Sequence, residues 1–472
     1  MAQYDLLVIG SGPAGQKAAV QAAKLGKTVG IIERKAAVGG VSTNTGTIPS
    51  KALREAVLYL SGFRQRNLYG AGYRLKKTVT IEDLVFRANH IIQNEIEIVK
   101  DQMTRNRIDL IFGDARFVDP HRLLVQQAGT STDHFAHVII IAVGTEPSRP
   151  ANIPFNGHTI IDTDGLIALK HLPTSIVIVG GGVIGTEYAA ILAMIGVPVV
   201  LIDKRPRLLE FVDAQIIDTL QRHMTDIGVT LCHEEEVVAI REESDGLVTV
   251  SLTHRPPITT TTLLYAIGRI GATKHLNLEA VGLTPDARGR VIVNEHFQTA
   301  IPHIYAAGDV IGFPALASTS MQQGRHAACH AFGHPDHTDT DLLPYGIYTI
   351  PEISTVGRNE EELTKAGTPY AVGIAHYREI ARGQLTGDET GMLKLLFHRR
   401  TRALLGVHAI GEGATEIIHI GQAVMAYRGK IDYFIDTVFN YPTLAECYKV
   451  AALDGINRLP RPWPQPTQEC ET

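Results

Sequence analysis

The stretch that decides the fold is residues 4–33, which read YDLLVIGSGPAGQKAAVQAAKLGKTVGIIE. Residues 4–9 are a short apolar run of the kind found in a buried parallel strand. Residues 14–25 are rich in alanine and typical of a helix, which Gly26 is expected to end. Residues 28–33 form a second apolar run, so the stretch predicts a strand–helix–strand unit of an α/β fold.

The turn between the first strand and the helix carries the pattern GxGxxG at Gly10, Gly12 and Gly15. The first glycine permits a tight turn, the second lets the backbone approach a pyrophosphate, and the third lets the helix pack on the strand. The helix N-terminus adds N–H groups and partial positive charge for the phosphates. Glu33 lies 18 residues after Gly15, where a carboxylate accepts ribose hydroxyls. The pattern predicts a dinucleotide site, with a plain glycine turn as the alternative.

The same order of elements recurs over residues 175–203. Gly180, Gly182 and Gly185 repeat the fingerprint after an apolar run, and a helical stretch follows them. Asp203 falls 18 residues after Gly185, in the position that Glu33 holds in the first unit. Two such units in one chain predict two nucleotide sites.

A basic cluster follows the acid of the second site. Asp203 is expected to accept the ribose hydroxyls of NAD(H) and to repel a 2′-phosphate. Lys204, Arg205 and Arg207 come directly after it and are able to bind the 2′-phosphate of NADP(H). Alternatively, they are solvated loop charges. An acid beside a basic cluster predicts a site that is not strictly selective between the two nucleotides.

The composition is that of an ordinary globular protein. The 472 residues suffice for about three domains at roughly 150 residues each. A net charge of −5 favours neither a nucleic acid nor a membrane surface as partner. No apolar run reaches the ~18 residues of a membrane span, and the N-terminus lacks the basic start of a signal peptide. These features predict a cytoplasmic protein.

The chain has four cysteines, Cys232, Cys329, Cys447 and Cys470. No two of them are close enough in sequence for a CxxC pair, which argues against a disulfide scaffold or a metal site.

The motifs also divide the chain. The two fingerprints and the proline-rich stretch near residue 150 predict two Rossmann-like domains, and the mixed strands and helices after Pro344 predict a C-terminal α+β domain. The expected parts are 1–150 (FAD-binding, first part), 151–270 (NAD(P)-binding), 271–343 (FAD and central domain, second part) and 344–472 (interface).

Three further segments resemble the flavoprotein disulfide reductases. Residues 305–309 read YAAGD, which resembles the flavin-contacting strand of that family, and residues 141–145 (IAVGT) resemble its strand returning from the FAD domain. The resemblance implies FAD in the first site. Residues 265–269 (YAIGR) resemble the strand leaving the NAD domain. The positions that match the family's FAD contacts are Gly113, Gly144, Thr145, Gly308, Asp309 and Ala317. Those that match the NAD(P) side are Gly268 and Arg269, with Arg269 near the nicotinamide.

The redox motif of that family, GGxCxNxGCxPSK, has lost both cysteines here. Residues 39–51 read GGVSTNTGTIPSK, with Ser42 and Thr47 in the cysteine positions. A hydroxyl forms neither a disulfide nor a thiolate nucleophile. Reductase activities that depend on the pair, such as those on lipoamide, glutathione, mercuric ion and trypanothione, are therefore excluded. The resemblance still places Gly39, Gly40 and Ser42 against FAD.

The family's second catalytic element, HPTxxE, is also altered. Here the matching residues are Tyr441-Pro442-Thr443-Leu444-Ala445-Glu446. A tyrosine, with an ordinary pKa of about 10, is a poor base at neutral pH. Tyr441 and Glu446 thus replace the His–Glu base, and the two changes together indicate a flavoprotein that no longer handles thiols.

The flavin-tuning pair of the family is retained. In the family, a lysine beside the flavin N5 pairs with a glutamate after the second fingerprint, and the matching residues are Lys51 and Glu187. A cation at N5 stabilises negative charge on the flavin and assists hydride arrival.

The chain as a whole resembles one subfamily, the soluble, Si-face-specific pyridine nucleotide transhydrogenases. The segments that carry the resemblance are GTIPSKALREAVLYL, GIYTIPEISTVG, EIIHIGQAV, FNYPTLAE and YKVAALDGINRL, which span residues 46–459. It implies a homodimer or larger homo-oligomer in which NADPH and NAD⁺ exchange a hydride through FAD by a ping-pong mechanism. Two other interpretations remain, an NAD(P)H diaphorase or oxidase and a non-catalytic flavoprotein scaffold. The direction of exchange, the preferred nucleotide and any effectors are left open.

Overall fold

The computed structural model describes residues 2–70, 72–76, 78–334 and 342–459, so Cys470 and the end of the expected interface domain lie outside it. The chain forms two compact units. The first comprises Met1–Ser61, Leu75–Pro206 and Gly228–Asp339, and the second comprises Gly62–Arg74, Arg207–Ile227 and Thr340–Thr472. None of the helices in the described part of the chain is long and apolar enough to cross a membrane.

The first unit contains a sheet built on the strand–helix–strand element at the N-terminus. Its strand order is β3-β2-β1-β6-β5-β4, and β17 pairs with the last residues of β6, past the stretch that pairs with β5. Strands β1, β2, β3, β6 and β17 run parallel, whereas β4 and β5 join by antiparallel pairing. The elements are β1 (Ala2–Ile9), α1 (Pro13–Lys24), β2 (Val29–Glu33), β3 (Asp109–Phe112), β4 (Asp114–Asp119), β5 (Arg122–Gln127), β6 (Thr130–Ile141) and β17 (Ile304–Ala306).

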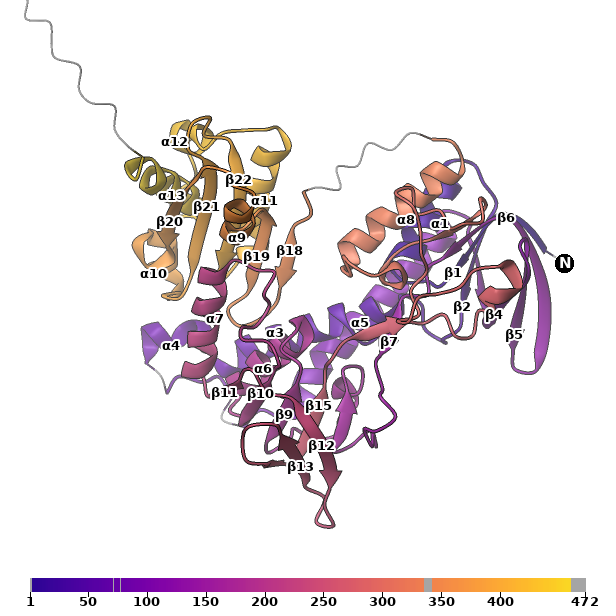
Figure 1. Cartoon of the computed structure of the whole chain (residues 1–472), viewed down its shortest axis with the longest axis horizontal. Coiled ribbons are helices and arrows are strands. Elements are labelled where there is room, and N and C mark those ends of the chain that lie inside the picture. Colours follow the sequence, from indigo (N-terminus) through magenta and orange to yellow (C-terminus); the bar gives the residue numbers. More distant parts are fainter. Residues whose placement is uncertain (1, 71, 77, 335–341, 460–472) are drawn as a thin grey trace, which may run out of the picture. The chain divides into compact units, whose positions relative to one another are not determined.

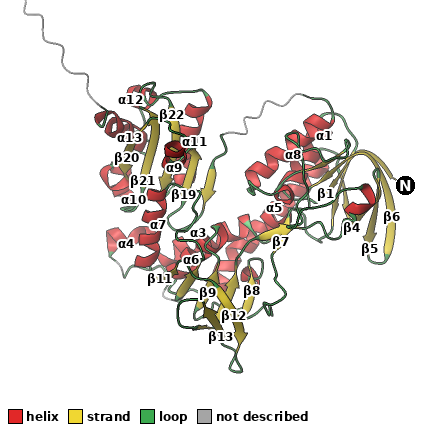
Figure 2. Ribbon diagram, viewed as in Figure 1, coloured by secondary structure: helices red, strands yellow, loops and turns green. Residues whose placement is uncertain are grey.

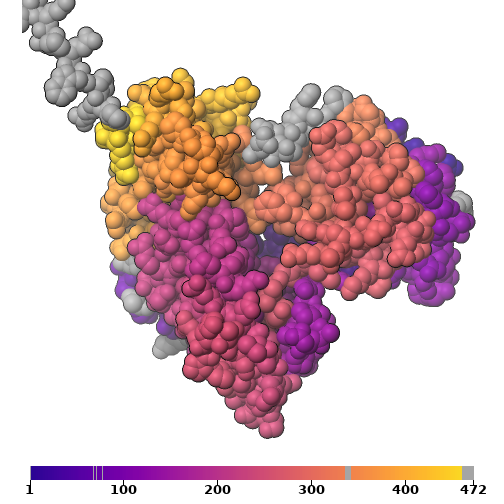
Figure 3. Space-filling model, viewed as in Figure 1, coloured from indigo at the N-terminus to yellow at the C-terminus, as the bar shows by residue number. Residues whose placement is uncertain are grey.

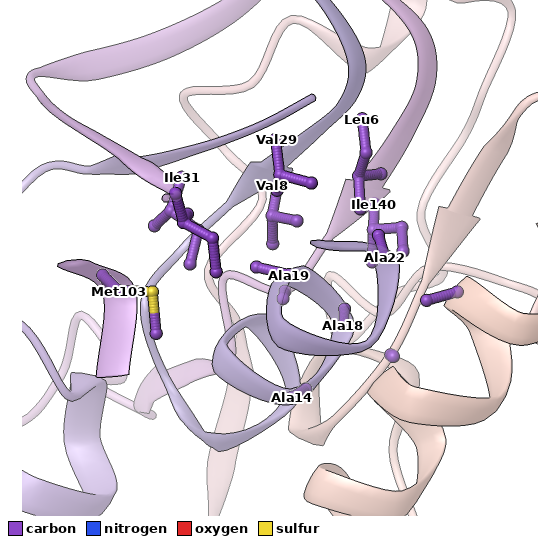
Figure 4. Close-up of a cluster of buried hydrophobic side chains, with 14 of the residues drawn as sticks. Leu6, Val8, Ala14, Ala18, Ala19, Ala22, Val29, Ile31, Met103 and Ile140 are labelled. Atoms are coloured by element: carbon purple, nitrogen blue, oxygen red, sulfur yellow. The ribbon is translucent and has the colours of Figure 1, made fainter. Parts of the chain in front are cut away.

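The predicted strand–helix–strand unit is therefore present at the expected residues. Its apolar side chains form part of the hydrophobic core. Ala18, Ala19 and Ala22 of α1 are fully buried against Leu6 and Ile31 of the sheet, as Figure 4 shows. Small side chains let the helix lie close to the strands, which brings its N-terminus to their carboxyl ends.

Helix α8 (Ala317–Ala331) packs beside α1 at very short range (Figure 1). A Cβ atom at Gly324 would lie 2.0 Å from the carbonyl oxygen of Ala14, so only glycine fits there. Three more helices of this unit are α2 (Gly40–Asn44), α3 (Thr47–Ser61) and α5 (Ile81–Arg105). Helix α5 is rich in charged residues, and a capping box between Thr80 and Asp83 defines its start.

The second fingerprint also lies in a parallel sheet, with the order β11-β10-β9-β15-β8. Its elements are β8 (Ile160–Asp162), β9 (Ile176–Val179), α6 (Val183–Met194), β10 (Val199–Ile202), β11 (Val229–Cys232) and β15 (Thr262–Tyr265). An antiparallel sheet is formed by β12 (Val237–Glu242), β13 (Val248–Leu252) and β14 (Ile258–Thr260), of which β13 and β14 make a hairpin. A two-stranded ribbon joins β7 (Thr145–Pro147) to β16 (Arg269–Gly271).

The second unit is built on an antiparallel sheet in the order β18-β19-β22-β21-β20 (Figure 2). Residues 342–459 form one continuous body in the space-filling view (Figure 3). The strands are β18 (Tyr345–Ile347), β19 (Ile353–Gly357), β20 (Tyr370–His376), β21 (Met392–His398) and β22 (Leu404–Ile410). The helices are α4 (Phe63–Tyr69), α7 (Ala214–Asp226), α9 (Glu360–Lys365), α10 (Ala381–Thr386), α11 (Ala414–Ala426), α12 (Asp432–Asp436) and α13 (Glu446–Asn457).

A buried lysine ties three elements of this unit together. Lys394 on β21 is 1% exposed, and its ammonium donates to both carboxylate oxygens of Asp213, at 2.8 and 2.9 Å. It also donates to Glu360 at the start of α9. Because Asp213 caps α7 by accepting from the Gln215 N–H, the lysine anchors that helix to the sheet.

Candidate active site

The first fingerprint has the geometry of a phosphate cradle. Gly10 has a φ of +104°, and a Cβ atom there would lie 2.4 Å from the Ala142 carbonyl oxygen. Gly12 begins α1 without a side-chain cap, so the first N–H groups of the helix face the turn. Gly40 approaches Gly12 so closely that a Cβ atom on Gly40 would lie 2.8 Å from the Gly12 Cα. The residues that line this turn therefore fit a pyrophosphate.

Glu33 lies at the end of β2 beside the fingerprint. It is buried, and its carboxylate accepts from the Ser11 N–H and hydroxyl at 3.1 and 2.6 Å and from the Lys35 N–H at 2.8 Å. The Ser11 hydroxyl also accepts from the Gly39 N–H at 3.0 Å. Sequence analysis missed this bridging role of Ser11, for which the only signal was a hydroxyl within the glycine pattern.

Asp309 follows β17 and is surrounded by residues of α8. Its Oδ1 accepts from the Ser320 hydroxyl at 3.1 Å, and the neighbouring Gly308 N–H donates to the Gln323 side chain at 2.8 Å. Burial raises the pKa of the Asp309 carboxyl, while the bond from Ser320 opposes this effect. Ala317, the first residue of α8, has no side-chain cap before it. Ser320 and Gln323 are further residues that sequence analysis missed.

The remaining residues matched to FAD contacts have different environments. Gly113 follows β3, and its N–H donates to the Glu33 carbonyl at 2.9 Å. Gly144 has a φ of +63° with open space where a Cβ would lie. Thr145 instead uses both its hydroxyl and its carbonyl to accept from Arg269, at 2.9 and 3.0 Å. The observed partner of Thr145 is thus a side chain of the strand that leaves the second nucleotide domain.

Arg269 binds residues from two separate segments of the first unit, one at Thr145 and the other at Thr163 and Asp164. Besides its bonds to Thr145, it donates to the Thr163 hydroxyl at 3.1 Å and pairs with Asp164 at 2.7 Å. Neighbouring Gly268 has a φ of +111°, which lets the chain turn directly before the arginine. Tyr188 on α6 is fully buried, and its pKa is raised by burial and by the charges of Glu187 and Asp164, against the opposing charge of Arg269. Thr163 and Asp164 lie in the sequence TDG, which gave no prior signal.

The second fingerprint repeats the geometry of the first. Gly180 has a φ of +111°, and a Cβ atom there would lie 2.6 Å from the Ala266 carbonyl oxygen. A Cβ atom on Gly185 would lie 2.0 Å from the Gly180 carbonyl oxygen, whereas one on Gly182 would meet nothing within 4 Å. Helix α6 begins at this open position without a side-chain cap. The turn therefore fits a second pyrophosphate.

In the second site, the Asp203 carboxylate and the Arg205 guanidinium form an ion pair with each other. Asp203 is 6% exposed and accepts from the Gly181 N–H at 2.5 Å. The guanidinium of Arg205 forms a two-point pair with the same carboxylate, at 2.8 and 2.7 Å, and the Arg205 N–H adds a third bond at 2.8 Å. Burial alone would raise the pKa of Asp203, but the bonds from Arg205 outweigh burial and lower it. Lys204 is exposed, and Arg207, a residue of the second unit, pairs with Glu361 at 3.5 Å.

Lys51 and Glu187 form the contact that joins the two fingerprint regions. The Lys51 ammonium lies 2.7 Å from Glu187 Oε2 and 3.2 Å from the Ser50 hydroxyl. Lys51 is on α3, which follows the altered redox motif, and Glu187 is on α6, directly after the second fingerprint. The Glu187 side chain is 5% exposed and that of Lys51 is 25% exposed, so the ammonium is held at the edge of the protein interior.

None of the three described cysteines belongs to the altered redox motif. Ser42 is on α2 and Thr47 begins α3, and both are partly exposed. The three cysteines of the described residues, Cys232, Cys329 and Cys447, are free and buried. Burial raises the pKa of Cys447 to about 12, and the neighbouring Glu446 charge adds to the shift. A thiol in that state is a poor nucleophile at neutral pH.

The residues matched to the family's His–Glu base lie in the second unit. Tyr441 is 72% exposed. Glu446 begins α13, and its Oε2 is buried without a hydrogen-bond partner among the described residues. Tyr441 stands in the position of the family's histidine, so Glu446 has no histidine there to orient.

Comparison with known proteins agrees with this geometry. A profile described as pyridine nucleotide-disulphide oxidoreductase matches residues 4–324, and the profile of that family's dimerisation domain matches residues 343–452. The chain belongs to the pyridine nucleotide-disulphide oxidoreductase family. FAD is the cofactor of this family, and the predicted α/β class with a C-terminal dimerisation domain is confirmed.

Two curated relatives with full-length similarity are named soluble pyridine nucleotide transhydrogenase. The soluble pyridine nucleotide transhydrogenase of Mycobacterium bovis is 52% identical over 461 residues, which are 97% of this chain and 98% of the relative. That of Marinobacter nauticus is 45% identical over 460 residues, covering 97% and 99%. Among solved structures, LpdA from Mycobacterium tuberculosis aligns with a TM-score of 0.88 at 24% identity, covering 96% and 99%. A Cu(II) complex of the HOCl-induced flavoprotein disulfide reductase RclA from Escherichia coli aligns with a TM-score of 0.86 at 27% identity and the same coverage.

Proposed function

We propose that this chain is a soluble NAD(P)⁺ transhydrogenase of Si-face specificity that exchanges a hydride between NADPH and NAD⁺ through FAD, without a redox-active disulfide. The observation that carries the proposal is the Lys51–Glu187 pair at 2.7 Å, retained while Ser42 and Thr47 replace the cysteines. Relatives named as transhydrogenases, at 45–52% identity over 97% of the chain, support it.

The first site provides the residues to hold FAD. The N–H groups at the start of α1 would bind the pyrophosphate, Glu33 the ribose, and Asp309 the ribityl chain. FAD, when bound, supplies a group that accepts a hydride and returns it. Lys51 would lie beside the flavin with its charge oriented by Glu187, so that negative charge arriving there is stabilised. Gly39, Gly40 and Ser42 would line the same cofactor.

The second site would receive the two nucleotides in turn. The open turn at Gly182 would bind their pyrophosphate, and Asp203 and Arg205 their adenosine ends. Arg269, held by Asp164 and Thr145, would set the position of the nicotinamide side. Hydride transfer moves no proton, so the scheme requires no general base, which is consistent with Tyr441 in place of a histidine.

We also propose that the protein is a cytoplasmic homodimer or larger homo-oligomer. The match of residues 343–452 to a dimerisation domain supports association through the second unit.

The function is tested with the purified, FAD-containing protein. NADPH should bleach the flavin absorbance, and an NAD⁺ analogue with a distinct spectrum should restore it and accumulate in reduced form. A protein that is reoxidised by oxygen or quinones but not by the analogue would be a diaphorase or oxidase. Failure of NADPH to bleach the flavin would identify a non-catalytic flavoprotein.

Thiol-blocking reagents are expected to leave the exchange activity intact. The cysteine positions of the redox motif hold Ser42 and Thr47, and the three described cysteines are buried. The measurement is exchange rate after treatment with iodoacetamide under native conditions, with modified sites mapped by mass spectrometry. A loss of activity that parallels modification of Cys447 would contradict the prediction.

Asp203→Asn is expected to weaken binding of NAD⁺ about ten- to a hundredfold while sparing NADP⁺. The substitution removes a charged acceptor for the ribose, worth roughly 1.5–3 kcal/mol. It also removes a negative charge beside the 2′-phosphate and releases Arg205 from its two-point pair. Arg205→Met should do the reverse.

The check is the dissociation constant of each nucleotide for both variants, measured by calorimetry on the FAD-containing protein. Arg241→Met is a matched control, because Arg241 is an exposed cation on β12, outside the basic cluster that follows Asp203. Equal shifts for NAD⁺ and NADP⁺ in both variants would show that the acid–base pair does not set nucleotide choice.

A further inference from the structure

A histidine lies beside the Asp203–Arg205 pair, on the neighbouring strand. Strands β10 and β11 run parallel, with Ile202 paired to Cys232, so Asp203 and His233 are the next residues on each strand. The backbone adds three bonds between the two segments. The Asp203 N–H donates to the Cys232 carbonyl at 2.9 Å, the Glu235 N–H to the Asp203 carbonyl at 3.2 Å, and the Glu234 N–H to the Arg205 carbonyl at 3.3 Å.

The imidazole of His233 lies near the Arg205 carbonyl, without a hydrogen bond of ordinary geometry to it. Both ring nitrogens are shielded from solvent, and neither has a hydrogen-bond partner among the described residues. Buried polar atoms are almost always paired in folded proteins. Two orphaned ring nitrogens at the carboxyl end of a Rossmann sheet, where nucleotides bind, indicate a ligand contact.

The groups that face this ring come from three segments. Asp203 and the Arg205 carbonyl come from the end of β10, and Glu234 follows the histidine itself. Arg255, between β13 and β14, lies 3.4 Å from the Cys232 sulfur and 3.6 Å from Glu235. Burial lowers the pKa of His233, and the positive charge of Arg255 lowers this pKa further. Asp203, the Arg205 carbonyl and Glu234 raise it. Burial is the largest effect, so the pKa of His233 lies below its ordinary value. The ring of the nucleotide-free protein is therefore neutral at pH 7 and gains a proton as the pH falls.

We propose that His233 is a specificity-determining residue of the NAD(P) site, which favours NADP(H) over NAD(H) when it is protonated. The inference rests on the proposed function, since it assumes that Asp203 marks the 2′ position of the adenosine ribose. At that position Arg205 is already neutralised by Asp203, so an entering 2′-phosphate has to share it. A protonated His233 supplies a second cation to the phosphate and competes with a ribose hydroxyl for Asp203. Falling pH then strengthens NADP(H) binding and weakens NAD(H) binding.

The test is the ratio of the dissociation constants, Kd of NADP⁺ over Kd of NAD⁺, for the FAD-containing full chain between pH 5.5 and 8.5. Calorimetry measures both constants without turnover. For the unaltered protein, the ratio is expected to be about tenfold lower at pH 6 than at pH 8. The 2′-phosphate itself takes up a proton with a pKa of about 6, which acts in the opposite direction.

His233→Gln is the decisive variant, because glutamine keeps hydrogen-bonding groups of similar reach but does not titrate. Its ratio is expected to stay constant or rise as the pH falls. His254→Gln is the matched control: His254 is an exposed histidine of the β13–β14 connection and should leave the profile unchanged. His233→Asn serves if the glutamine variant is unstable.

Three outcomes overturn the inference. The ratio of the unaltered protein does not fall as the pH falls, or His233→Gln keeps the profile of the unaltered protein, or His254→Gln abolishes it. In each case the protein still binds both nucleotides and the proposed function stands. If the unaltered protein binds only one nucleotide at every pH, the proposed function fails as well.

Discussion

Lys51→Met is expected to slow reduction of the bound flavin by NADPH about 10²- to 10³-fold, with little loss of FAD. The ammonium lies 2.7 Å from the buried carboxylate of Glu187, so its position is set before any hydride arrives. A charge that is already in place requires no rearrangement as negative charge develops, which is why such groups act on rate. Methionine keeps the length of the side chain and removes only the charge.

The measurement is the single-turnover rate of flavin bleaching in a stopped-flow instrument, with FAD content determined on the same sample. Lys51→Arg is the matched control, because it retains a cation within reach of Glu187 and should keep more of the rate than methionine does. Glu187→Gln should have an intermediate effect, since the cation remains but loses a charged partner that orients it. An unchanged rate in Lys51→Met would falsify the assigned role of this lysine.

Lys394→Met is expected to lower the stability of the second unit by about 3–5 kcal/mol. The ammonium is 1% exposed and satisfies both oxygens of Asp213 together with Glu360. Without the lysine, Asp213 is left as a buried carboxylate with one remaining bond, from the Gln215 N–H. The cost is mainly that of the unpaired buried charge, rather than the strength of the lost pair.

Hydrogen exchange of peptides from β21 and β22 measures this effect locally, without treating the whole chain as a two-state system. The double variant Lys394→Met/Asp213→Asn should recover most of the loss, because it removes both charges and keeps an acceptor for the Gln215 N–H. Arg458→Met is the surface control. Arg458 pairs with Asp454 at an exposed site, so its loss should cost at most about 1 kcal/mol. Equal protection in Lys394→Met and Arg458→Met would show that the buried lysine is unimportant.

The same cluster predicts how stability depends on pH. Burial opposes ionisation of Asp213, but His408 and Lys394 outweigh burial and lower its pKa below the usual value. The stability from this group is therefore present above the ordinary carboxylate pKa of about 3.9 and is lost as the pH falls below it.

The two nucleotide-binding folds follow from residue type and spacing alone. The turns have glycine at 10, 15, 180 and 185, where a Cβ atom would overlap a neighbouring backbone carbonyl. Residue type and spacing are therefore enough to predict these turns. The lapse of thiol chemistry is likewise local, because Ser42 and Thr47 lack sulfur in any conformation. Strand and helix periodicity predicted β1, α1, β9 and α6 to within about two residues for the same reason.

Only the tertiary structure decided which side chains meet. The sequence placed Lys51 and Glu187 in one site through a resemblance, and their contact spans 136 positions of the chain. It did not indicate that Asp203 and Arg205 bind each other, that Arg269 is held by Thr163 and Asp164, or that His233 faces the acid from the next strand. The Asp203–Arg205 pair is local and depends on the conformations of two side chains. The other contacts follow from the packing of segments that are distant in sequence, and residue type and spacing do not encode them. The physical reason is that a turn is a local property of the backbone, whereas the pairing of charges depends on where the whole fold carries them.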